Sequence, residues 1–308
     1  MLPNALSERV LDCIIVGGGP AGLTAALYLG RFRRHVLLID AGESRAAWIP
    51  VSHNQPSFPG GISGLDLLQR MKQQAERFGT EIRGSLRVDH IQPAESGFLV
   101  EFADGSATAK TILLATGVVN HRPDMRIDLH REAVARGLIR YCPICDGFEA
   151  MNQKIAVLGA DDHGVDEALF LRTYSANITL LCAREIASAK MQRFAEAGIE
   201  IVTRPVTSIA IDQTRIVVDV ERSTTGFAFD TLYPALGSSS NIELATRMGA
   251  AVSDQGCLIV DDHQMTTCAG VYAAGDVVEG LDQISVAAGQ AAIAATAIHN
   301  RLRSLEGR

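Results

Sequence analysis

Cys13-Ile14-Ile15-Val16-Gly17-Gly18-Gly19-Pro20-Ala21-Gly22 is the stretch of sequence that decides the fold. Four apolar residues of strand length run directly into a glycine-rich turn, and a helical stretch from Leu23 to Leu29 follows. Glycines let such a turn close and let the backbone approach a pyrophosphate, whose charge then lies at the positive end of the helix. The residues that we predict to contact a dinucleotide here are Gly17, Gly19, Pro20, Ala21 and Gly22.

A second apolar strand supplies the other half of this pattern. Val36-Leu37-Leu38-Ile39 ends on Asp40, eighteen residues after Gly22, where an acid can hydrogen-bond a ribose hydroxyl. A glycine pattern alone is a weak signal. A strand before it, a helix after it and an acid at the next strand end are together typical of a Rossmann-type nucleotide site.

Length and composition limit the class of protein. At 308 residues the chain is too long for one ordinary core and fits two domains of about 150 residues. Its 47% apolar residues, 20% charged residues and 28 glycines are typical of a soluble α/β protein. The net charge of -7 argues against nucleic acid as a partner, because phosphate binding needs a basic surface. The sequence shows no leader-like N-terminus and no apolar run of bilayer length, so we expect a cytoplasmic location and no membrane partner.

The strand, turn and helix pattern recurs in the middle of the chain. Apolar residues 155–158 lead into Gly159-Ala160-Asp161-Asp162-His163-Gly164, after which a helix is expected over residues 165–174 and a strand over residues 178–181. Further alternating strands are expected at residues 199–202, 209–211 and 216–218.

Two linkers separate this second pattern from the rest. Residues 111–117 form a buried strand that ends in a small-residue turn and a polar, proline-bearing stretch, and residues 235–240 return the chain. The predicted fold class is α/β, with two Rossmann-like, three-layer nucleotide-binding domains, the second inserted in the first. The predicted boundaries are 1–118 for the first part of the outer domain, 119–243 for the inserted domain, and 244–308 for the second part of the outer domain.

Cys142-Pro143-Ile144-Cys145-Asp146-Gly147, in the inserted domain, carries the chemistry. Two cysteines separated by two residues can close a disulfide, attack a partner's disulfide, or exchange electrons with a flavin held against them. A zinc site would need a second ligand pair at short spacing, and the other four cysteines are scattered singly, so we predict no metal. Structural disulfides are rare in a reducing compartment, which favours a catalytic role for the close pair.

Four motifs together give the chain a resemblance to a known family. They are the N-terminal G-x-G-x-x-G, the strand end Ala115-Thr116-Gly117, the C-x-x-C-Asp, and the strand end Ala273-Ala274-Gly275-Asp276. In order and spacing they are similar, from end to end, to the low-molecular-weight (class II) thioredoxin reductases. The cysteine pair inside the inserted domain separates this family from the larger disulfide reductases, whose pair lies near the N-terminus.

The resemblance implies FAD as the cofactor. Gly17, Gly19 and Gly22 would surround its pyrophosphate, Asp40 would lie near the adenosine ribose, and Asp276 would hold the ribityl or pyrophosphate. Gln283 and the helix after it would face the pyrimidine end of the isoalloxazine, where the helix dipole favours the charge of the reduced ring. The remaining candidate flavin-site residues are Asn54, Thr116, Gly117, Gly275 and Ile284.

The same resemblance implies a division of roles at the cysteines. Cys145 would approach the flavin, Cys142 would exchange with a substrate disulfide, and Asp146 would donate and accept the proton. The residue pattern itself also fits an Asx turn in which Asp146 caps Gly147, and the two roles are compatible. Members of the family are commonly homodimers.

The chain departs from the family where NADPH should bind. The family's Gly-Gly-Gly-Asp-Ser-Ala turn is here replaced at its second and third glycines by Ala160 and Asp161. A carboxylate about 5 Å from one phosphate charge costs roughly 3 kcal/mol at an effective dielectric of about 20. The family's His-Arg-Arg, which recognises the 2′-phosphate, is here Cys182-Ala183-Arg184, with one arginine instead of two. Both changes argue against NADPH as the donor.

Four functions remain open on the sequence. The chain resembles pyridine-nucleotide-independent thioredoxin reductases, in which a protein such as ferredoxin would reduce the flavin and Cys142 would reduce thioredoxin. It also resembles FAD-dependent oxidases that close disulfides in small dithiols and discharge the flavin to oxygen. A third reading is an NADPH-dependent thioredoxin reductase with altered contacts. The fourth is a flavin-bound redox sensor without turnover, which Trp48 would fit because the reductases carry Gly-Gly-Gln there.

Overall fold

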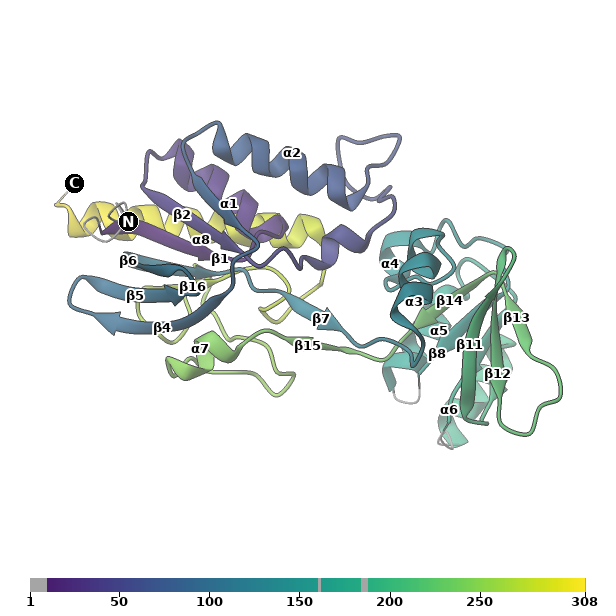
Figure 1. The fold of residues 1–308 in the computed structure, drawn as a ribbon. Coiled ribbons are helices and arrows are strands. Elements are labelled where there is room, and N and C mark those ends of the chain that lie inside the picture. The colour runs from purple at the N-terminus through teal and green to yellow at the C-terminus, as the bar shows by residue number, and fades with distance from the viewer. Residues whose placement is uncertain (1–9, 160–161, 184–187, 308) are drawn as a thin grey trace. The chain divides into compact units, whose positions relative to one another are not determined.

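The computed structural model describes residues 10–159, 162–183 and 188–307, which divide into two compact units (Figure 1). The first unit comprises the described parts of Met1–Ala47, Gly64–Val119 and Ser239–Arg308. The second unit comprises Trp48–Ser63 and the described parts of Asn120–Ser238. Each unit is built on its own parallel sheet, which confirms the predicted α/β fold with two Rossmann-like domains.

The sheet of the first unit has the order β3-β2-β1-β6-β5-β4, with β16 beside β6. Its parallel part pairs β1 with β2 and β6, β2 with β3, and β6 with β16, whereas β4, β5 and β6 form an antiparallel meander. The strands are β1 (Leu11–Val16), β2 (Val36–Asp40), β3 (Glu81–Gly84), β4 (Val88–Ala94), β5 (Gly97–Phe102), β6 (Gly105–Leu114) and β16 (Val271–Ala273).

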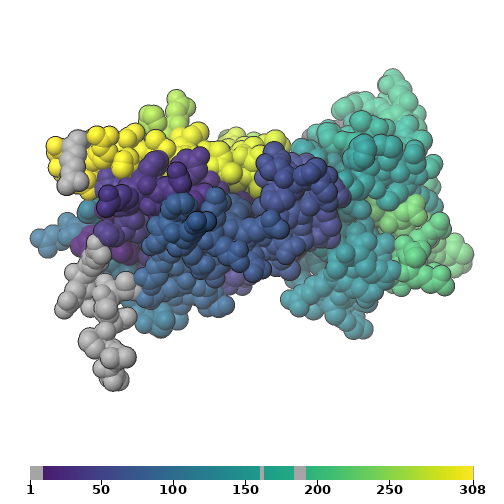
Figure 2. Space-filling model, turned by 90° about the horizontal axis from the view of Figure 1, so that it is seen from above, coloured from purple at the N-terminus to yellow at the C-terminus, as the bar shows by residue number. Residues whose placement is uncertain are grey.

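Alternating burial along β1 explains why this sheet has two packed faces. Ile14 and Val16 join one core cluster with the meander and the chain around Leu258, whereas Cys13 and Ile15 join the cluster beneath the helices. Buried alanines at Ala25 and Ala26 let α1 approach the sheet and α8 closely. The helices and helical turns are α1 (Pro20–Arg31), η1 (Arg45–Trp48), α2 (Gly64–Glu76), α7 (Glu243–Arg247) and α8 (Ile284–Leu305). Figure 2 shows the C-terminal helix, in yellow, alongside the purple N-terminal part of the chain.

The second unit has a four-stranded parallel sheet, β10-β9-β8-β14, and a three-stranded antiparallel sheet, β11-β12-β13. Val157 and Leu180 point to the core cluster that contains α5 and α6 residues, whereas Ala156 and Leu181 join the cluster with the antiparallel sheet. The strands are β8 (Ile155–Leu158), β9 (Ile178–Leu181), β10 (Glu200–Val202), β11 (Val206–Asp212), β12 (Arg215–Val220), β13 (Phe227–Phe229) and β14 (Thr231–Pro234). The helices are α3 (Ile127–Ala135), α4 (Pro143–Asp146), α5 (Asp162–Leu171) and α6 (Ser188–Ala197).

The chain passes between the units along two paired strands, β7 (Val118–Asn120) and β15 (Ser238–Ser240). The predicted boundaries at 118/119 and 243/244 lie close to these strands. One segment is grouped differently from the prediction. Trp48–Ser63 falls within the predicted outer domain, but the structure groups it with the second unit. Among the described residues, no helix is both long and apolar enough to cross a bilayer.

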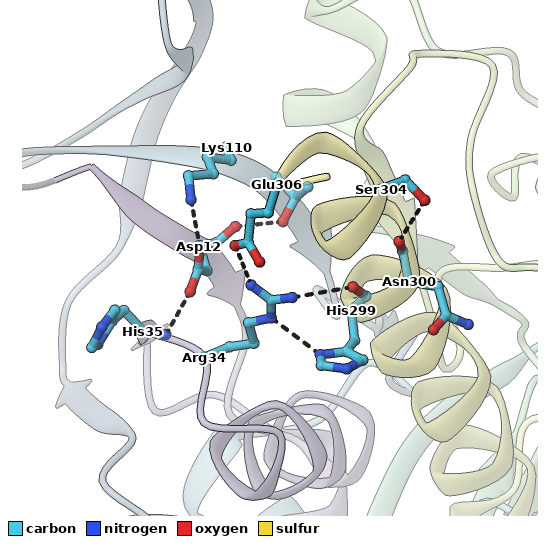
Figure 3. Close-up of polar contacts among 9 residues, drawn as sticks. Asp12, Arg34, His35, Lys110, His299, Asn300, Ser304 and Glu306 are labelled. Carbon is cyan, nitrogen blue, oxygen red and sulfur yellow. Dashed lines mark hydrogen bonds and ion pairs between the residues drawn. The ribbon is translucent and has the colours of Figure 1, made fainter. Parts of the chain in front are cut away.

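An ion-pair network fastens the ends of the first unit together (Figure 3). Asp12, which is only 6% exposed at the start of β1, accepts a hydrogen bond from the His35 N–H at 3.0 Å and pairs with the Lys110 ammonium at 2.9 Å. Arg34 pairs with Glu306 beyond the end of α8 at 2.6 Å and donates to His299 Nδ1 at 3.1 Å. The network therefore ties β1, β6 and the C-terminal helix to the turn before β2.

The charge of Asp12 links this network to pH. Burial alone would raise the pKa of Asp12, but the Lys110 hydrogen bond, the His35 N–H and the charges of Lys110 and Arg34 outweigh burial and lower that pKa. A carboxyl whose pKa is lower in the folded state contributes stability above its unfolded value of about 3.9 and loses that contribution as pH falls through the folded value.

We predict that Asp12→Asn lowers the free energy of unfolding at neutral pH by about 1.5–3 kcal/mol, as expected for a hydrogen bond to a charged group. The difference from wild type should begin to shrink below about pH 4, the unfolded pKa, and should vanish once pH falls below the lower folded-state pKa of Asp12. Urea unfolding followed by circular dichroism measures both effects. Asp104→Asn is the matched control, because Asp104 is exposed and precedes Gly105 in a hairpin turn that asparagine also suits. Equal urea midpoints for Asp12→Asn and wild type at neutral pH would contradict the assignment.

Candidate active site

The glycine turn between β1 and α1 is a place where side chains do not fit. Gly17 has a φ of +109°, and a Cβ on it would lie 2.2 Å from the Ala115 carbonyl oxygen. A Cβ on Gly22 would lie 1.9 Å from the Gly17 carbonyl oxygen. Gly19 is the N-cap of α1 and, having no side chain, provides no side-chain hydrogen bond to the first turn, and Pro20 follows as the first helical residue. The N–H groups at this helix start are therefore turned toward an anion site.

The predicted ribose acid lies directly against this turn. Asp40 ends β2, and its Oδ1 accepts a hydrogen bond from the Gly18 N–H at 3.0 Å. A Cβ on Gly18 would lie 2.4 Å from the Asp40 carboxyl carbon, so the middle glycine is needed for this approach. A carboxylate has several acceptor positions, so Asp40 can also accept from a ribose hydroxyl.

The end of β16 and the start of α8 lie at the same glycine turn. A Cβ on Gly275 would lie 3.0 Å from the Ala21 Cβ and 3.6 Å from the Ala287 Cβ, which brings the end of β16 against the first turns of α1 and α8. The Gly275 N–H donates to Gln290 Oε1 on α8 at 2.8 Å. Gln283 is the N-cap of α8 and gives it no side-chain cap, and Ile284 is its first residue. Two helix N-termini thus lie at one site.

Arg45 is a residue of this site that the sequence did not reveal. It lies in η1, after β2, and its Nη2 is 2.7 Å from Asp276 Oδ2 and 3.1 Å from Asp282 Oδ2. Burial and the Asp276 charge raise the pKa of Asp282, and Arg45 opposes this rise. Arg45 therefore orients Asp276, the predicted ribityl or pyrophosphate ligand, from more than two hundred residues away.

Thr116 and Gly117 hold the strand end of β6 in place. Thr116 Oγ1 donates to the Asn241 carbonyl at 2.7 Å, the Asn241 side-chain amide donates to the Thr116 carbonyl at 2.8 Å, and the Asn241 N–H donates to Gly117 O at 3.0 Å. Gly117 has a φ of +63°, which favours glycine. Both residues lie beside the glycine turn, since Ala115 contacts Gly17 and Gly22.

The residues of the first unit fit FAD. The turn excludes side chains where a pyrophosphate would lie, two long helices begin there without side-chain caps, and a strand-end acid lies against the turn. Asn54, also predicted to contact the flavin, is grouped with the second unit, where its Oδ1 accepts from Ser52 Oγ at 2.9 Å, and its flavin contact stays a prediction.

The cysteine pair of the second unit is joined as a disulfide, Cys142–Cys145, with Cα atoms 5.2 Å apart. Cys142 is the N-cap of α4, and its Sγ accepts a hydrogen bond from the Cys145 N–H at 3.2 Å. Pro143 is the first helical residue and is buried. The Cys142 sulfur therefore has a backbone N–H donor, a contact of the kind that stabilises a thiolate.

Asp146, the predicted proton carrier, is held by two partners. Its Oδ1 accepts from the Tyr233 hydroxyl at 2.9 Å, and its Oδ2 lies 3.2 Å from Arg140 Nη1. Burial raises the pKa of Asp146, against the opposing charge of Arg140 and the Tyr233 hydrogen bond. An Asx cap at Gly147 would have the Asp146 side chain accept a hydrogen bond from the Gly147 N–H. That N–H donates instead to the Pro143 carbonyl, at 2.9 Å.

Cys145 lines an open pocket of about 600 Å³, together with two groups that the sequence did not single out, His53 and Glu149. His53 Nδ1 lies 2.8 Å from Glu149 Oε1. The other lining residues are Asn54, Ile144, Phe148 and Tyr174. The pocket therefore combines a disulfide sulfur, a paired histidine and carboxylate, and an apolar wall that includes Phe148, which is 69% exposed.

Trp48 packs within the second unit. Its ring lies edge-on to His130, with centroids 5.7 Å apart, and 6.1 Å from the Tyr141 ring. The buried His130 shares a hydrogen bond of 2.6 Å with the Tyr141 hydroxyl, and burial lowers the pKa of His130. Since Tyr141 precedes Cys142, Trp48 contributes to the packing next to the disulfide.

The turn expected to bind the electron donor is described only in part. Ala160, Asp161 and Arg184, on which the argument against NADPH depends, lie outside the described residues. A Cβ on Gly164 would lie 3.0 Å from Gly159, so the close approach of β8 and α5 typical of a nucleotide turn is present. Within the described ranges, no three His, Cys, Asp or Glu side chains are grouped so as to hold a metal ion.

Comparison with known proteins places this arrangement among disulfide reductases. A family model described as pyridine nucleotide-disulphide oxidoreductase matches residues 11–291. Thioredoxin reductase of Streptomyces clavuligerus is 32% identical over 88% of this chain and 87% of its own, and that of Treponema pallidum is 30% identical over 97% and 99%. The crystal structure of thioredoxin reductase from Streptococcus pyogenes matches with a TM-score of 0.88 at 28% identity, covering 97% of this chain and all of that one.

We predict that Gly22→Ala weakens FAD binding by more than about tenfold, because the new Cβ would lie 1.9 Å from a backbone oxygen and would force α1 away from the turn. Flavin content after purification and quenching of flavin fluorescence by the apoprotein measure the change. Gly289→Ala, on α8, is the matched control, since a Cβ there has no heavy atom within 4 Å. Unchanged affinity in Gly22→Ala would show that the turn does not bind the cofactor.

Proposed function

The chain belongs to the pyridine nucleotide-disulphide oxidoreductase family and is a flavin disulfide oxidoreductase of the thioredoxin reductase type, and we propose that its Cys142–Cys145 pair passes electrons between FAD and thioredoxin or a similar disulfide. The observation that carries the proposal is a closed disulfide beside an open pocket, in a chain that also has a glycine turn fitted to a dinucleotide. FAD supplies a carrier that exchanges two electrons with a disulfide.

The residues of the first unit hold the cofactor in this proposal. Gly17, Gly19 and Gly22 admit the pyrophosphate, and Asp40 accepts from the ribose. Asp276, oriented by Arg45, binds the ribityl or pyrophosphate region. The N-terminus of α8 favours the negative charge of a reduced ring near the pyrimidine end.

The residues of the second unit perform the thiol chemistry. After reduction, the Cys142 thiolate, favoured by the Cys145 N–H, attacks the substrate disulfide and forms a mixed disulfide. Cys145 then displaces the substrate and closes the Cys142–Cys145 bond. Positioned acid–base groups speed proton transfers of this kind by about 10²–10⁴-fold.

The proposed donor is a protein such as ferredoxin rather than NADPH. Support comes from the sequence, since Ala160 and Asp161 replace two glycines at the phosphate-binding turn and one arginine remains where the family has two. A homodimer in the cytoplasm remains the expected state. Stoichiometric reduction of thioredoxin that stops after one event would instead support a redox sensor.

A second candidate function is oxidation of a small dithiol, with oxygen accepting the electrons. The pocket favours it, because about 600 Å³ lies in the range of small-molecule sites and its wall is partly apolar. Turnover of small dithiols with oxygen uptake, in the absence of thioredoxin, separates this candidate from the first.

We predict that Cys145→Ser abolishes electron transfer between flavin and disulfide while leaving FAD bound. Dithionite-reduced enzyme should then no longer reduce thioredoxin, as followed by anaerobic stopped-flow absorbance of the flavin. Cys257→Ser, which changes a half-buried single cysteine, should retain the wild-type rate. Transfer that persists in Cys145→Ser would refute the role of this sulfur.

We also predict that millimolar NADPH or NADH leaves the flavin spectrum unchanged over minutes under anaerobic conditions, whereas dithionite bleaches it. The double substitution Ala160→Gly and Asp161→Gly removes the charge opposed to the phosphates and should give measurable bleaching by NADPH. Rapid bleaching of the wild-type flavin by either nucleotide would overturn the proposed NADPH independence.

A further inference from the structure

Glu149 carries an oxygen that the disulfide form of the protein leaves without a hydrogen-bond partner. Its Oε1 lies 2.8 Å from His53 Nδ1, whereas Oε2 is buried and has no hydrogen-bond partner among the described residues. A buried carboxylate oxygen without a donor is costly, so such an atom calls for an explanation. The pocket supplies one, because Cys145 lines it together with Glu149.

The carboxylate and the sulfur line the same pocket and lie close together in sequence. Glu149 follows Cys145 by four residues in a stretch of consecutive turns, in which the Gly147 N–H donates to the Pro143 carbonyl and the Ala150 N–H donates to the Gly147 carbonyl. The pocket therefore places both side chains along one cavity. In the disulfide the Cys145 sulfur has no proton to donate, but in the dithiol it gains an S–H.

We infer that Glu149 accepts the proton of the Cys145 thiol during dithiol–disulfide exchange and returns it in the reverse direction, with His53 as its positioning residue. The two sulfurs then have separate proton partners: Asp146, the proton carrier that the resemblance implies, is left to serve Cys142, and Glu149 serves Cys145. The inference deepens the proposed function by naming the group that activates the resolving cysteine.

Asp146 is poorly placed to serve both sulfurs. Its two oxygens are engaged by the Tyr233 hydroxyl and the Arg140 guanidinium, and neither of these residues lines the Cys145 pocket. Among the residues that the structure describes, the ionisable side chains that line the pocket beside the cysteine are His53, Glu149 and Tyr174.

A short loop holds His53 against Glu149. Ser52 and Ile62 exchange two backbone hydrogen bonds, of 2.8 and 3.0 Å, that close the base of the loop. A Cβ on Gly61, whose φ is +76°, would lie 2.7 Å from the His53 ring, so the ring packs directly on the backbone of this glycine. The closed loop and the packing on Gly61 therefore place His53, whose side chain is 46% exposed, beside Glu149.

Reduction of the substrate disulfide requires only the enzyme dithiol and the substrate. The Cys142 thiolate attacks one sulfur of a substrate disulfide, the substrate bond breaks, and the first substrate sulfur leaves as a thiolate. The Cys145 thiol gives its proton to Glu149, and its thiolate attacks Cys142 Sγ in the mixed disulfide. The mixed disulfide breaks, the second substrate sulfur leaves as a thiolate, and the Cys142–Cys145 bond forms. Two electrons pass from the enzyme dithiol to the substrate.

Dithiobis(nitrobenzoate) tests the inference because its two thionitrobenzoate ions are released in separate phases. The flavoprotein is first reduced with dithiothreitol and freed of it, so the test needs no electron donor and stays valid even if flavin fails to reduce the disulfide. The first phase reports attack by Cys142, and the second reports resolution by Cys145. A Cys142→Ser/Cys145→Ser variant supplies the background from the other cysteines.

Glu149→Gln should leave the first phase unchanged and slow the second by about 10²-fold near neutral pH, the lower end of acid–base contributions. The second-phase rate of this variant should rise tenfold per pH unit, as expected when hydroxide alone ionises the thiol, whereas the wild-type rate should level off at lower pH. Glu132→Gln, which alters an ion pair with Arg136 in the same unit, should behave as wild type in both phases.

His53 should show the effect of a positioning residue. His53→Gln keeps an N–H that can donate to Glu149 and should retain most of the second-phase rate, whereas His53→Ala should lose about tenfold. A second phase that is unchanged in Glu149→Gln would overturn the inference. Equal slowing of both phases with an unaltered pH profile would also overturn it, because that result indicates a structural role.

Discussion

The contact of Gly22 with the Gly17 carbonyl is the constraint on which the first unit depends. Because neither residue carries a side chain, the first turn of α1 lies directly against the turn that follows β1. The same closeness lets Gly275 reach Ala21 and lets α8 begin beside α1. Two helix N-termini therefore meet at one place, and the positive potential that suits a dinucleotide is a consequence of backbone packing rather than of basic side chains.

The sequence predicted the parts of the structure that depend on neighbouring residues. Apolar runs of strand length, glycines at the turn and Asp40 at the next strand end lie within about thirty residues, and their combination determines β1, α1 and β2 without knowledge of the rest. The same reasoning found the cysteine pair, because a spacing of three is itself enough to close a disulfide. These features are local, and local signals can be read from one chain.

The residues that sequence reasoning missed share a different property. Arg45 contacts Asp276 across 231 positions, and Tyr233 contacts Asp146 across 87. Nothing in the neighbourhood of Arg45 or Tyr233 marks either residue, since a charged residue in a turn and an aromatic in a strand are ordinary occurrences. Only the folded chain shows which of them faces a functional group. The resemblance named Asn54 for the flavin site, and the structure groups its segment with the unit that carries the disulfide.

The loop that carries His53 shows why the inserted domain is not a self-contained unit of chemistry. Residues 120–238 include both cysteines, Asp146 and Glu149, but the partner of Glu149 comes from a segment that precedes them by almost one hundred residues. An excised inserted domain would keep the contacts of Asp146 with Arg140 and Tyr233, because all three residues lie within residues 120–238. It would lose the imidazole beside Glu149. The two carboxylates near the disulfide therefore differ in their partners. Asp146 is held by residues of the inserted domain itself. Glu149 depends on a loop, Trp48–Ser63, that lies in sequence between two segments of the first unit.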